Sequence, residues 1–228
     1  MAGSGRRRKN SGPSPPSSAS SPEDLVRAAL AAGVRDRRVL EALRTTPRTR
    51  FVPAAHAAAA YIDAPLPIGR GQVTSQPSLS ALMIEGLELT GTEHVLEIGT
   101  GHGFQTALLA RVAGDVVSID RWPELVEEAR RNLLGEGIGT VELLVGDGTL
   151  GVPEHAPYDA VLISAAFLKV PPPVTARLRP GGRLVAPIGP GGREDVVSFV
   201  RTDAGLAREG ILTGASFVRL YGRHGYPP

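Results

Sequence analysis

The stretch Val95-Leu96-Glu97-Ile98-Gly99-Thr100-Gly101-His102-Gly103-Phe104-Gln105 decides the fold of this chain. Apolar residues run into a glycine-rich turn, and residues 104–110 follow with the apolar spacing of a helix. The start of such a helix presents free backbone N–H groups to a ligand. Glycines at 99, 101 and 103 allow positive φ and a close approach of that ligand. The stretch therefore predicts a ligand-binding turn at the carboxyl end of a strand.

The turn differs from the pattern of a nicotinamide-binding protein. Its spacing is Gly-x-Gly-x-Gly, where a dinucleotide site has Gly-x-Gly-x-x-Gly. Glu97 stands two residues before the first glycine, where a carboxylate would repel a pyrophosphate and attract a cation. The pattern favours S-adenosylmethionine, which carries an amino group and a sulfonium, as the ligand.

Strands and helices are expected to alternate around this turn. The expected strands are 95–99, 116–119, 141–145, 160–163 and 183–187, and the expected helices are 104–112, 123–134 and 173–178. The strands are continuous apolar runs, as in a parallel sheet covered on both faces. The pattern predicts a doubly wound, Rossmann-like α/β fold of the S-adenosylmethionine-dependent methyltransferase type. Residues 196–200 and 211–220 are expected to add antiparallel strands at one end.

The chain before this core divides into a tail and a helical part. Residues 1–20 are rich in Ser, Pro and basic side chains, so we expect them to be disordered. Residues 21–228 are expected to form a single domain, divided into N-terminal helices and an active-site loop (21–93), a cofactor-binding core (94–190) and C-terminal strands (191–228).

Within the N-terminal part, helices are expected at 22–33, 36–43, 54–61 and 78–89. The last of these should turn Leu79, Leu82, Met83 and Leu87 inward. The segment 63–77 holds three prolines and two glycines, which exclude a helix and allow only an interrupted edge strand. Structured loops of this length are often functional.

Composition limits the function further. The 228 residues suit one domain, and the absence of cysteine excludes disulfides and thiolate metal sites. The net charge is +2, but residues 1–22 contribute +4, which leaves −2 for the rest and argues against a nucleic-acid-binding surface. No secretory signal and no membrane-spanning run is recognisable. We therefore expect a cytoplasmic, monomeric protein with no metal, membrane or nucleic-acid partner.

Three carboxylates follow three successive strands. In a doubly wound sheet, ligands lie beyond the carboxyl ends of the strands. Glu97 stands at the first of these ends, Asp120 at the second, where an acid binds ribose hydroxyls, and Asp147 at the third, where it could accept a hydrogen bond from an adenine amino group. The alternative for each is helix capping, and both roles can coexist.

The chain resembles the protein-L-isoaspartate (D-aspartate) O-methyltransferase family from about residue 34 to about residue 220. The matching stretches are residues 50–53, 64–77, 95–110, 146–148, 159–166 and 217–220. The glycine turn is common to many methyltransferases. The segment Pro65-Leu66-Pro67-Ile68-Gly69 to Ser75-Gln76-Pro77 is much more specific.

The resemblance implies that Ser75 is the active-site serine and that residues 72–75 lie over the cofactor and the acceptor. It makes Asp120 the ribose-binding acid and Asp147 the acid near adenine. Val73-Thr74 replaces Thr-Ile, His102-Gly103-Phe104 replaces Ser-Gly-Tyr, and Ser164 replaces a Thr of the family. The expected cofactor-binding residues are Gln72, Val73, Thr74, Ser75, Glu97, Gly99, Thr100, Gly101, Gly103, Asp120, Arg121, Asp147 and Gly148.

The resemblance implies methyl transfer to a carboxylate, which is already ionised near pH 7 and needs no general base. Catalysis then requires holding the acceptor oxygen, the methyl carbon and the sulfur in line. We expect Ser75 to donate a hydrogen bond to the acceptor carboxylate and not to act as a nucleophile. The alternative for Ser75 is a turn serine. His102 is expected on the solvent side of the glycine turn, and Trp122 is expected to pack at a helix start.

The expected function is methylation of the free carboxylate of isoaspartyl residues in damaged proteins, which leads to repair through a succinimide. One alternative is an aspartyl O-methyltransferase acting on a dedicated peptide. Another is a noncatalytic module that binds S-adenosylmethionine. A nucleic-acid methyltransferase is disfavoured, because Ser164-Ala165-Ala166 offers no base-stacking ring after the strand that ends at Ile163.

Overall fold

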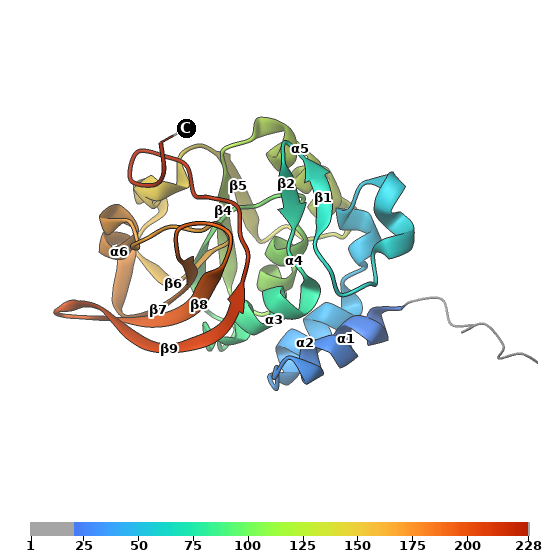
Figure 1. The fold of residues 1–228 in the computed structure, drawn as a ribbon, viewed down its shortest axis with the longest axis horizontal. Coiled ribbons are helices and arrows are strands. Elements are labelled where there is room, and N and C mark those ends of the chain that lie inside the picture. Colours follow the sequence, from blue (N-terminus) through green and yellow to red (C-terminus); the bar gives the residue numbers. More distant parts are fainter. Residues whose placement is uncertain (1–20, 228) are drawn as a thin grey trace, which may run out of the picture.

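The computed structural model describes residues 21–227, and Figure 1 shows their arrangement. The expected disorder of residues 1–20 lies outside this range. A seven-stranded sheet has the order β5-β4-β3-β6-β7-β8-β9, with helices on both faces. The predicted α/β fold of the doubly wound methyltransferase type is confirmed. The division of residues 21–228 into three parts of one domain stays a prediction.

The parallel half of the sheet contains β3 (His94–Ile98), β4 (Asp115–Asp120), β5 (Val141–Val145) and β6 (Tyr158–Ile163). β3 pairs in parallel with β4 on one side and with β6 on the other, so that Glu97 lies opposite both Ser118 and Leu162. The chain therefore reverses its direction of winding at β3. Such a switch point opens a crevice beyond the carboxyl ends of the strands.

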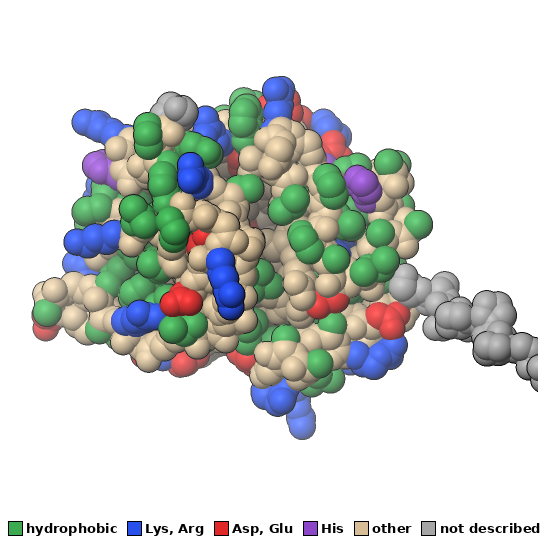
Figure 2. All heavy atoms as spheres, in the orientation of Figure 1, with side chains coloured by type: hydrophobic (Ala, Val, Ile, Leu, Met, Phe, Trp, Pro, Cys, Tyr) green, Lys and Arg blue, Asp and Glu red, His purple; other side chains and the backbone are tan. Residues whose placement is uncertain are grey.

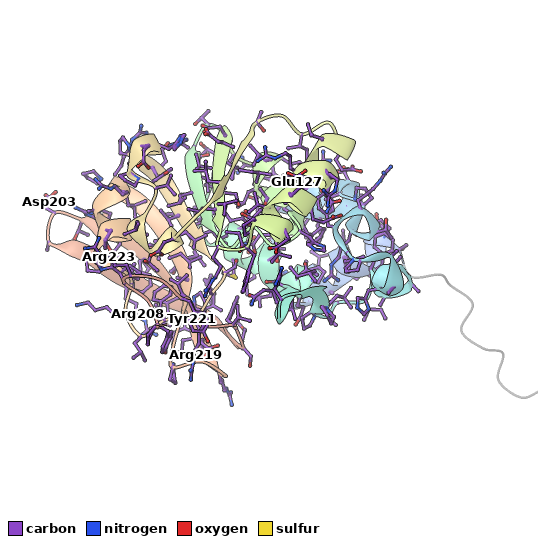
Figure 3. The ribbon with its side chains drawn as sticks, turned by 90° about the horizontal axis from the view of Figure 1, so that it is seen from above. Glu127, Asp203, Arg208, Arg219, Tyr221 and Arg223 are labelled. Carbon is purple, nitrogen blue, oxygen red and sulfur yellow. The ribbon has the colours of Figure 1, made fainter. Side chains whose placement is uncertain are left out.

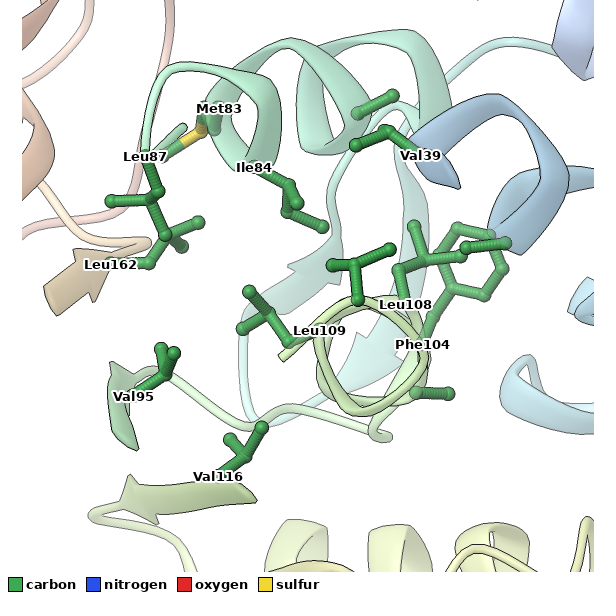
Figure 4. Close-up of a cluster of buried hydrophobic side chains, with 14 of the residues drawn as sticks. Val39, Met83, Ile84, Leu87, Val95, Phe104, Leu108, Leu109, Val116 and Leu162 are labelled. Carbon is green, nitrogen blue, oxygen red and sulfur yellow. The ribbon is translucent and has the colours of Figure 1, made fainter. Parts of the chain in front are cut away.

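Helices cover one face of the sheet in two layers. α3 (Pro77–Glu85), α4 (Phe104–Ala110) and α5 (Pro123–Gly135) contribute to the apolar cluster on the strands, and α1 (Pro22–Ala31) and α2 (Arg37–Thr45) add to it from outside. Figure 4 shows part of this cluster, with Leu108 and Leu109 of α4 between the helices and the strands. The second face is covered by α6 (Pro172–Arg177), which buries Val174.

The predicted inward face of the helix after the active-site loop is confirmed, whereas its predicted end at residue 89 is wrong. α3 ends at Glu85, and Leu79 and Leu82 are half-buried side chains that pack against the apolar cluster. Ser78, Ser80, Ala81 and Ile84 are buried together with Met83. α3 lies between the sheet and the outer helices α1 and α2, so small side chains are buried on the faces where neighbours approach.

The segment predicted as an interrupted edge strand forms a separate hairpin. β1 (Leu66–Gly69) and β2 (Gln72–Thr74) pair only with each other, so each is an edge strand, and the register shifts between Pro67 and Gly69; the prediction of an interrupted edge strand is confirmed. The turn has positive φ at Gly69, Arg70 and Gly71 (94°, 53° and 68°). Four 3-10 turns complete the chain: η1 (Arg48–Phe51) and η2 (Ala54–Ala59) precede the hairpin, and η3 (Gly148–Leu150) and η4 (Pro153–His155) follow β5.

The C-terminal strands are antiparallel, as predicted, but the last one has other bounds. β7 (Leu178–Ile188), β8 (Glu194–Thr202) and β9 (Gly205–Ala215) form a meander, so the predicted strand at 211–220 is wrong beyond residue 215. From residue 216 the chain leaves the sheet edge. Ala166 N–H donates to Val218 O (2.7 Å) and Leu220 N–H to Ala166 O (2.8 Å), which brings this segment to the carboxyl end of β6. Figure 3 shows Arg219, Tyr221 and Arg223 along it.

Candidate active site

The glycine turn after β3 is closely packed on its outer side. Gly99, Gly101 and Gly103 have positive φ (106°, 54° and 88°), as the sequence indicated. A Cβ atom at Gly101 would lie 3.1 Å from Ile68 Cδ1 of the hairpin. A side chain at position 101 would therefore need a small shift of the Ile68 side chain, and the positive φ would strain it.

Two adjoining cavities meet at this turn. The first, called here the hairpin cavity, is lined by Ile68, Gln72, Val73, Thr74, Ser75, Gly99, Thr100, Gly101, His102, Phe104, Gln105, Asp120, Leu125, Ser164 and Val218. The second, called the Tyr221 cavity, is lined by Gln72, Ile98, Gly99, Ile119, Asp120, Arg121, Trp122, Gly146, Gly148, Ser164, Ala165, Val218, Arg219, Leu220 and Tyr221. Five residues line both, which makes the cavities two halves of one elongated site.

The hairpin brings Ser75 to this site. Gln72, Val73, Thr74 and Ser75 line the hairpin cavity opposite the glycine turn, so the two sequence regions predicted to act together are adjacent. Val73 is also half-exposed at the surface, whereas Thr74 is buried. Ser75 therefore lines the same cavity as the glycine turn.

Asp120 lies where the two cavities meet. Its Oδ2 accepts a hydrogen bond from Gly101 N–H (2.9 Å) and its Oδ1 from Trp122 N–H (3.1 Å). Burial raises the pKa of Asp120, against the effect of these hydrogen bonds. Asp120 therefore fixes the glycine turn and the residue before α5, and it lines both cavities; because α5 begins without a side-chain cap, the capping alternative is wrong for Asp120.

Glu97 lies below the site and not in its wall. Its carboxylate is fully buried and accepts hydrogen bonds from Ser118 Oγ (2.6 Å), Thr106 Oγ1 (2.5 Å) and Gln105 Nε2 (3.1 Å). Burial raises the pKa of Glu97 to about 7, although these donors act in the opposite direction. Glu97 therefore reaches a ligand only through Gln105 and through the Ser118 hydroxyl, which hydrogen-bonds Thr100 (2.6 Å).

Gln105 also lines the hairpin cavity. It was not among the predicted site residues. Its Nε2 donates to Ser164 Oγ (2.7 Å) as well as to Glu97. Its Oε1 is buried and has no hydrogen-bond partner among residues 21–227. An unpaired buried acceptor is costly unless a ligand donates to it. An ammonium group, such as the amino group of S-adenosylmethionine, fits this acceptor.

Asp147 is turned away from the cavities. Oδ1 accepts from Thr149 N–H (2.9 Å) and Thr149 Oγ1 (2.6 Å), and Oδ2 accepts from Arg223 N–H (2.7 Å). Burial would raise its pKa, but the hydrogen bonds from Arg223 and Thr149 lower it. Its neighbours Gly146 and Gly148 line the Tyr221 cavity, whereas Asp147 anchors the C-terminal segment. The Asp147 carboxylate lines neither cavity, and its expected contact with adenine stays a prediction.

Several lining residues come from outside the predicted set. Ser164 follows β6, and Val218 and Tyr221 belong to the C-terminal segment. His102 lines the hairpin cavity and burial lowers its pKa, so its expected placement on the solvent side is wrong. The sequence signals for them were the departures from the family at residues 102 and 164 and the matching stretch 217–220, which contains Val218.

Trp122 packs at the start of α5, as expected, and connects the Tyr221 cavity to the hairpin tip. The Arg121 guanidinium lies 5.1 Å from the Trp122 ring centroid and 5.1 Å from that of Tyr221. The Arg70 guanidinium lies 5.3 Å from the same Trp122 ring. Arg121, which was predicted to bind the cofactor, thus stacks between two aromatic rings at the Tyr221 cavity.

The fold and this site define an S-adenosylmethionine-dependent methyltransferase. The switch point of the sheet, the glycine turn, Asp120 and the unpaired oxygen of Gln105 together match an elongated ligand with a ribose and an ammonium group. Among the described residues, no group of three or more His, Asp or Glu side chains is placed to hold a metal ion. No helix within residues 21–227 is long and apolar enough to cross a membrane.

Comparison with known proteins identifies the family. The family model described as protein-L-isoaspartate(D-aspartate) O-methyltransferase matches residues 20–225. A protein-L-isoaspartate O-methyltransferase of Methanoculleus marisnigri is 46% identical over 205 residues, which cover 90% of this chain and 93% of that protein. One of Anaeromyxobacter dehalogenans is 54% identical over 190 residues, 82% of this chain and 91% of that protein. The chain belongs to the protein-L-isoaspartate(D-aspartate) O-methyltransferase family.

Solved structures agree with this assignment. A protein-L-isoaspartate O-methyltransferase structure superposes with a TM-score of 0.78 at 30% identity, covering 90% of this chain and 67% of that one. The structure of a putative family member from Plasmodium falciparum in complex with S-adenosyl-L-homocysteine gives a TM-score of 0.73 at 19% identity, covering 88% and 98% of the two chains. The second similarity supports the fold.

Proposed function

We propose that this enzyme transfers a methyl group from S-adenosylmethionine to the free α-carboxylate of isoaspartyl residues in damaged proteins, and that Ser75 positions this carboxylate. The observation that carries the proposal is the shared lining of the hairpin cavity by Ser75, Asp120 and the glycine turn. The family match over residues 20–225 supports the reaction.

Residues of this chain would hold the donor across both cavities. Asp120 would accept hydrogen bonds from the ribose, and Gln105 Oε1 would accept one from the amino group. The glycine turn allows the donor to approach the backbone closely. S-adenosylmethionine supplies an electrophilic methyl group on a positively charged sulfur. We retain Gln72, Val73, Thr74, Ser75, Gly99, Thr100, Gly101, Gly103, Arg121 and Gly148 as further cofactor-site residues, with Glu97 and Asp147 acting from behind it.

Ser75 would act on the acceptor. A serine hydroxyl can donate one hydrogen bond, and a carboxylate accepts it without any proton transfer. The acceptor carboxylate is ionised near pH 7, so orientation is the main contribution that the chain must make. Methylation makes this carboxyl a better electrophile. The neighbouring backbone nitrogen then closes a succinimide with loss of methanol, and hydrolysis returns part of it as normal aspartate.

Methyl transfer to paired peptides tests the acceptor. Two hexapeptides that differ only in Asp against isoAsp are incubated with the protein and labelled S-adenosylmethionine. We expect label in the isoAsp peptide and little in the Asp peptide. Preference for the plain Asp peptide, or activity only with a dedicated precursor, would support the aspartyl O-methyltransferase alternative and overturn the repair function.

The variant Ser75→Ala tests the role of the serine. A hydrogen bond to a charged group contributes about 1.5–3 kcal/mol, so we expect kcat/KM for the isoAsp peptide to fall about 10- to 100-fold. The Kd for S-adenosylhomocysteine, measured by calorimetry, should stay nearly constant. Ser80→Ala is the matched control, because Ser80 Oγ is buried on α3 without a hydrogen-bond partner among the described residues. Unchanged kcat/KM in Ser75→Ala would contradict the assigned role.

Three sequence predictions accompany this proposal: a monomer, a cytoplasmic location, and no nucleic-acid or membrane partner. The charge distribution supports the absence of a nucleic-acid partner, because residues 21–228 carry a net charge of −2. Figure 2 shows basic and acidic side chains interspersed on the face that holds the hairpin. Light scattering after gel filtration would give a mass near 23.8 kDa for a monomer.

A further inference from the structure

Arg48 is a buried cation that has no role in the reaction proposed above. Its side chain is fully buried in η1, and burial lowers its pKa to about 10, which still leaves it charged at pH 7. Within residues 21–227 it forms no ion pair within 4 Å of a carboxylate. A buried charge without such a partner is costly, so its hydrogen bonds must compensate for the lost water.

Backbone carbonyls provide this compensation for Nη1 and Nη2, whereas Nε is buried without a hydrogen-bond partner among the described residues. Arg48 Nη1 donates to Ala60 O (3.2 Å) and Ile62 O (3.0 Å). Nη2 donates to Ala64 O (2.9 Å) and Ser75 O (3.1 Å). One nitrogen thus binds the chain just before the β1–β2 hairpin and just after it. The two ends of the hairpin are held together at its base by a single group.

The same guanidinium lies over the ring of Phe104, which follows the glycine turn. Its Cζ lies 5.5 Å from the centroid of Phe104, the first residue of α4 and part of the wall of the hairpin cavity. Arg48 therefore connects the segment that carries Ser75 to the helix that follows the turn. A planar fork of five donors can bind several carbonyls in fixed directions, whereas a lysine ammonium cannot reproduce this geometry.

Asp63 holds the residues that follow Ser75. Its Oδ1 accepts from Ser78 N–H (2.9 Å), and its Oδ2 accepts from Ser78 Oγ (2.7 Å) and Gln76 Nε2 (2.8 Å). Asp63 belongs to the loop of residues 60–64, whose carbonyls bind Arg48. Ser75 is thus held through its own carbonyl by Arg48, and the residues that follow it are held by Asp63.

We propose that Arg48 is a positioning residue for methyl transfer, which fixes Ser75 through the Ser75 carbonyl and the base of the hairpin. This inference rests on the proposed role of Ser75. It assigns to Arg48 no contact with the donor or the acceptor. The loss of its fork should let Ser75 Oγ move relative to the acceptor, and a misplacement of about 1 Å can reduce turnover about 100-fold.

A double-mutant cycle with Arg48→Lys and Ser75→Ala tests this inference. We expect Arg48→Lys alone to lower kcat/KM for the isoAsp peptide about 10- to 100-fold. In the Ser75→Ala background, the same change should cost less than about threefold, because the group that Arg48 positions is gone. Arg50→Lys is the control: it lies in the same turn, is exposed, and pairs with Glu136 (3.3 Å).

Equal losses in both backgrounds would overturn the role of Arg48 and leave the proposed function intact. Wild-type activity of Ser75→Ala would overturn both, because Arg48 would then have no catalytic group to position. Circular dichroism checks that each variant folds. If Arg48→Lys does not fold, Asp63→Asn replaces it in the cycle, and equal losses for that variant overturn the inference in the same way.

Discussion

Glu97 places an ionisable group in the fully buried layer between β3 and α4. Burial raises its pKa to about 7 from the usual value of 4.5. The unfolded chain therefore releases this proton at lower pH than the folded protein does, and deprotonation favours unfolding. The stabilisation from Glu97 is complete below about pH 4.5 and is lost as pH rises through about 7.

This pKa predicts how stability depends on pH. The difference corresponds to about 3 kcal/mol in the free energy of unfolding between these pH values. In Glu97→Gln the side chain cannot ionise, so urea unfolding from pH 4.5 to 8 should give a flatter profile than the wild type. Glu127→Gln, an exposed position on α5, is the control and should follow the wild type. Parallel profiles for Glu97→Gln and the wild type would contradict the prediction.

The sequence predicted the positions of some site residues and not those of others. Asp120 was predictable because it ends a strand next to the glycine turn, and its hydrogen bonds to Gly101 and Trp122 keep it there. Asp147 follows an equivalent pattern, yet it binds Arg223, which lies 76 residues away. Gln105 and Arg48 gave no signal, because the value of a buried polar group depends on partners that only the fold brings to it.

At the scale of elements, the β1–β2 hairpin covers the glycine turn and is attached at both ends. Arg48 holds its base, while at its tip Arg70 stacks on Trp122 and forms an ion pair with Glu124 of α5. An exposed ion pair and a cation–π contact each contribute about 0.5–1 kcal/mol. The tip contacts therefore resist opening of the hairpin only weakly.

The variant Arg70→Ala should release S-adenosylhomocysteine faster, by roughly two- to fivefold, because the hairpin opens more easily. Trp122 is the single tryptophan of the chain and lies at the Tyr221 cavity, so its fluorescence can follow dissociation in a stopped-flow experiment. Arg131→Ala on α5, whose side chain pairs with Glu127 and Glu128, is the control. An unchanged release rate in Arg70→Ala would show that the tip does not limit exit.

Helices and strands that a local sequence pattern defines were predicted well. The strands β3 to β6 and the helices α4 and α5 begin and end within about two residues of their predicted bounds, because apolar runs and glycine breaks define them. The pairing partner of the interrupted edge strand was not predicted, and the predicted end of the last strand was wrong. Whether residues 66–74 pair with each other or with the main sheet, and whether residues 216–220 stay in the sheet, depends on partners such as Ala166 that are distant in sequence.

At the scale of the molecule, three parts of the chain meet at one switch point. The parallel sheet supplies the glycine turn and Asp120, the N-terminal part supplies Ser75 and its support by Arg48, and the C-terminal segment returns to supply Val218 and Tyr221. The sequence could predict the first two through a strand pattern and a family resemblance. The third required the meander of β7, β8 and β9, whose exit toward β6 no local pattern indicates.

The central claim is that donor and acceptor meet between the glycine turn and Ser75. The most direct measurement is a crystal structure of the enzyme with S-adenosylhomocysteine and an isoAsp peptide. The account predicts the nucleoside along both cavities with its ribose on Asp120, and the isoaspartyl carboxylate within hydrogen-bonding distance of Ser75 Oγ, facing the sulfur. A carboxylate bound elsewhere, with Ser75 contacting neither ligand, would contradict it.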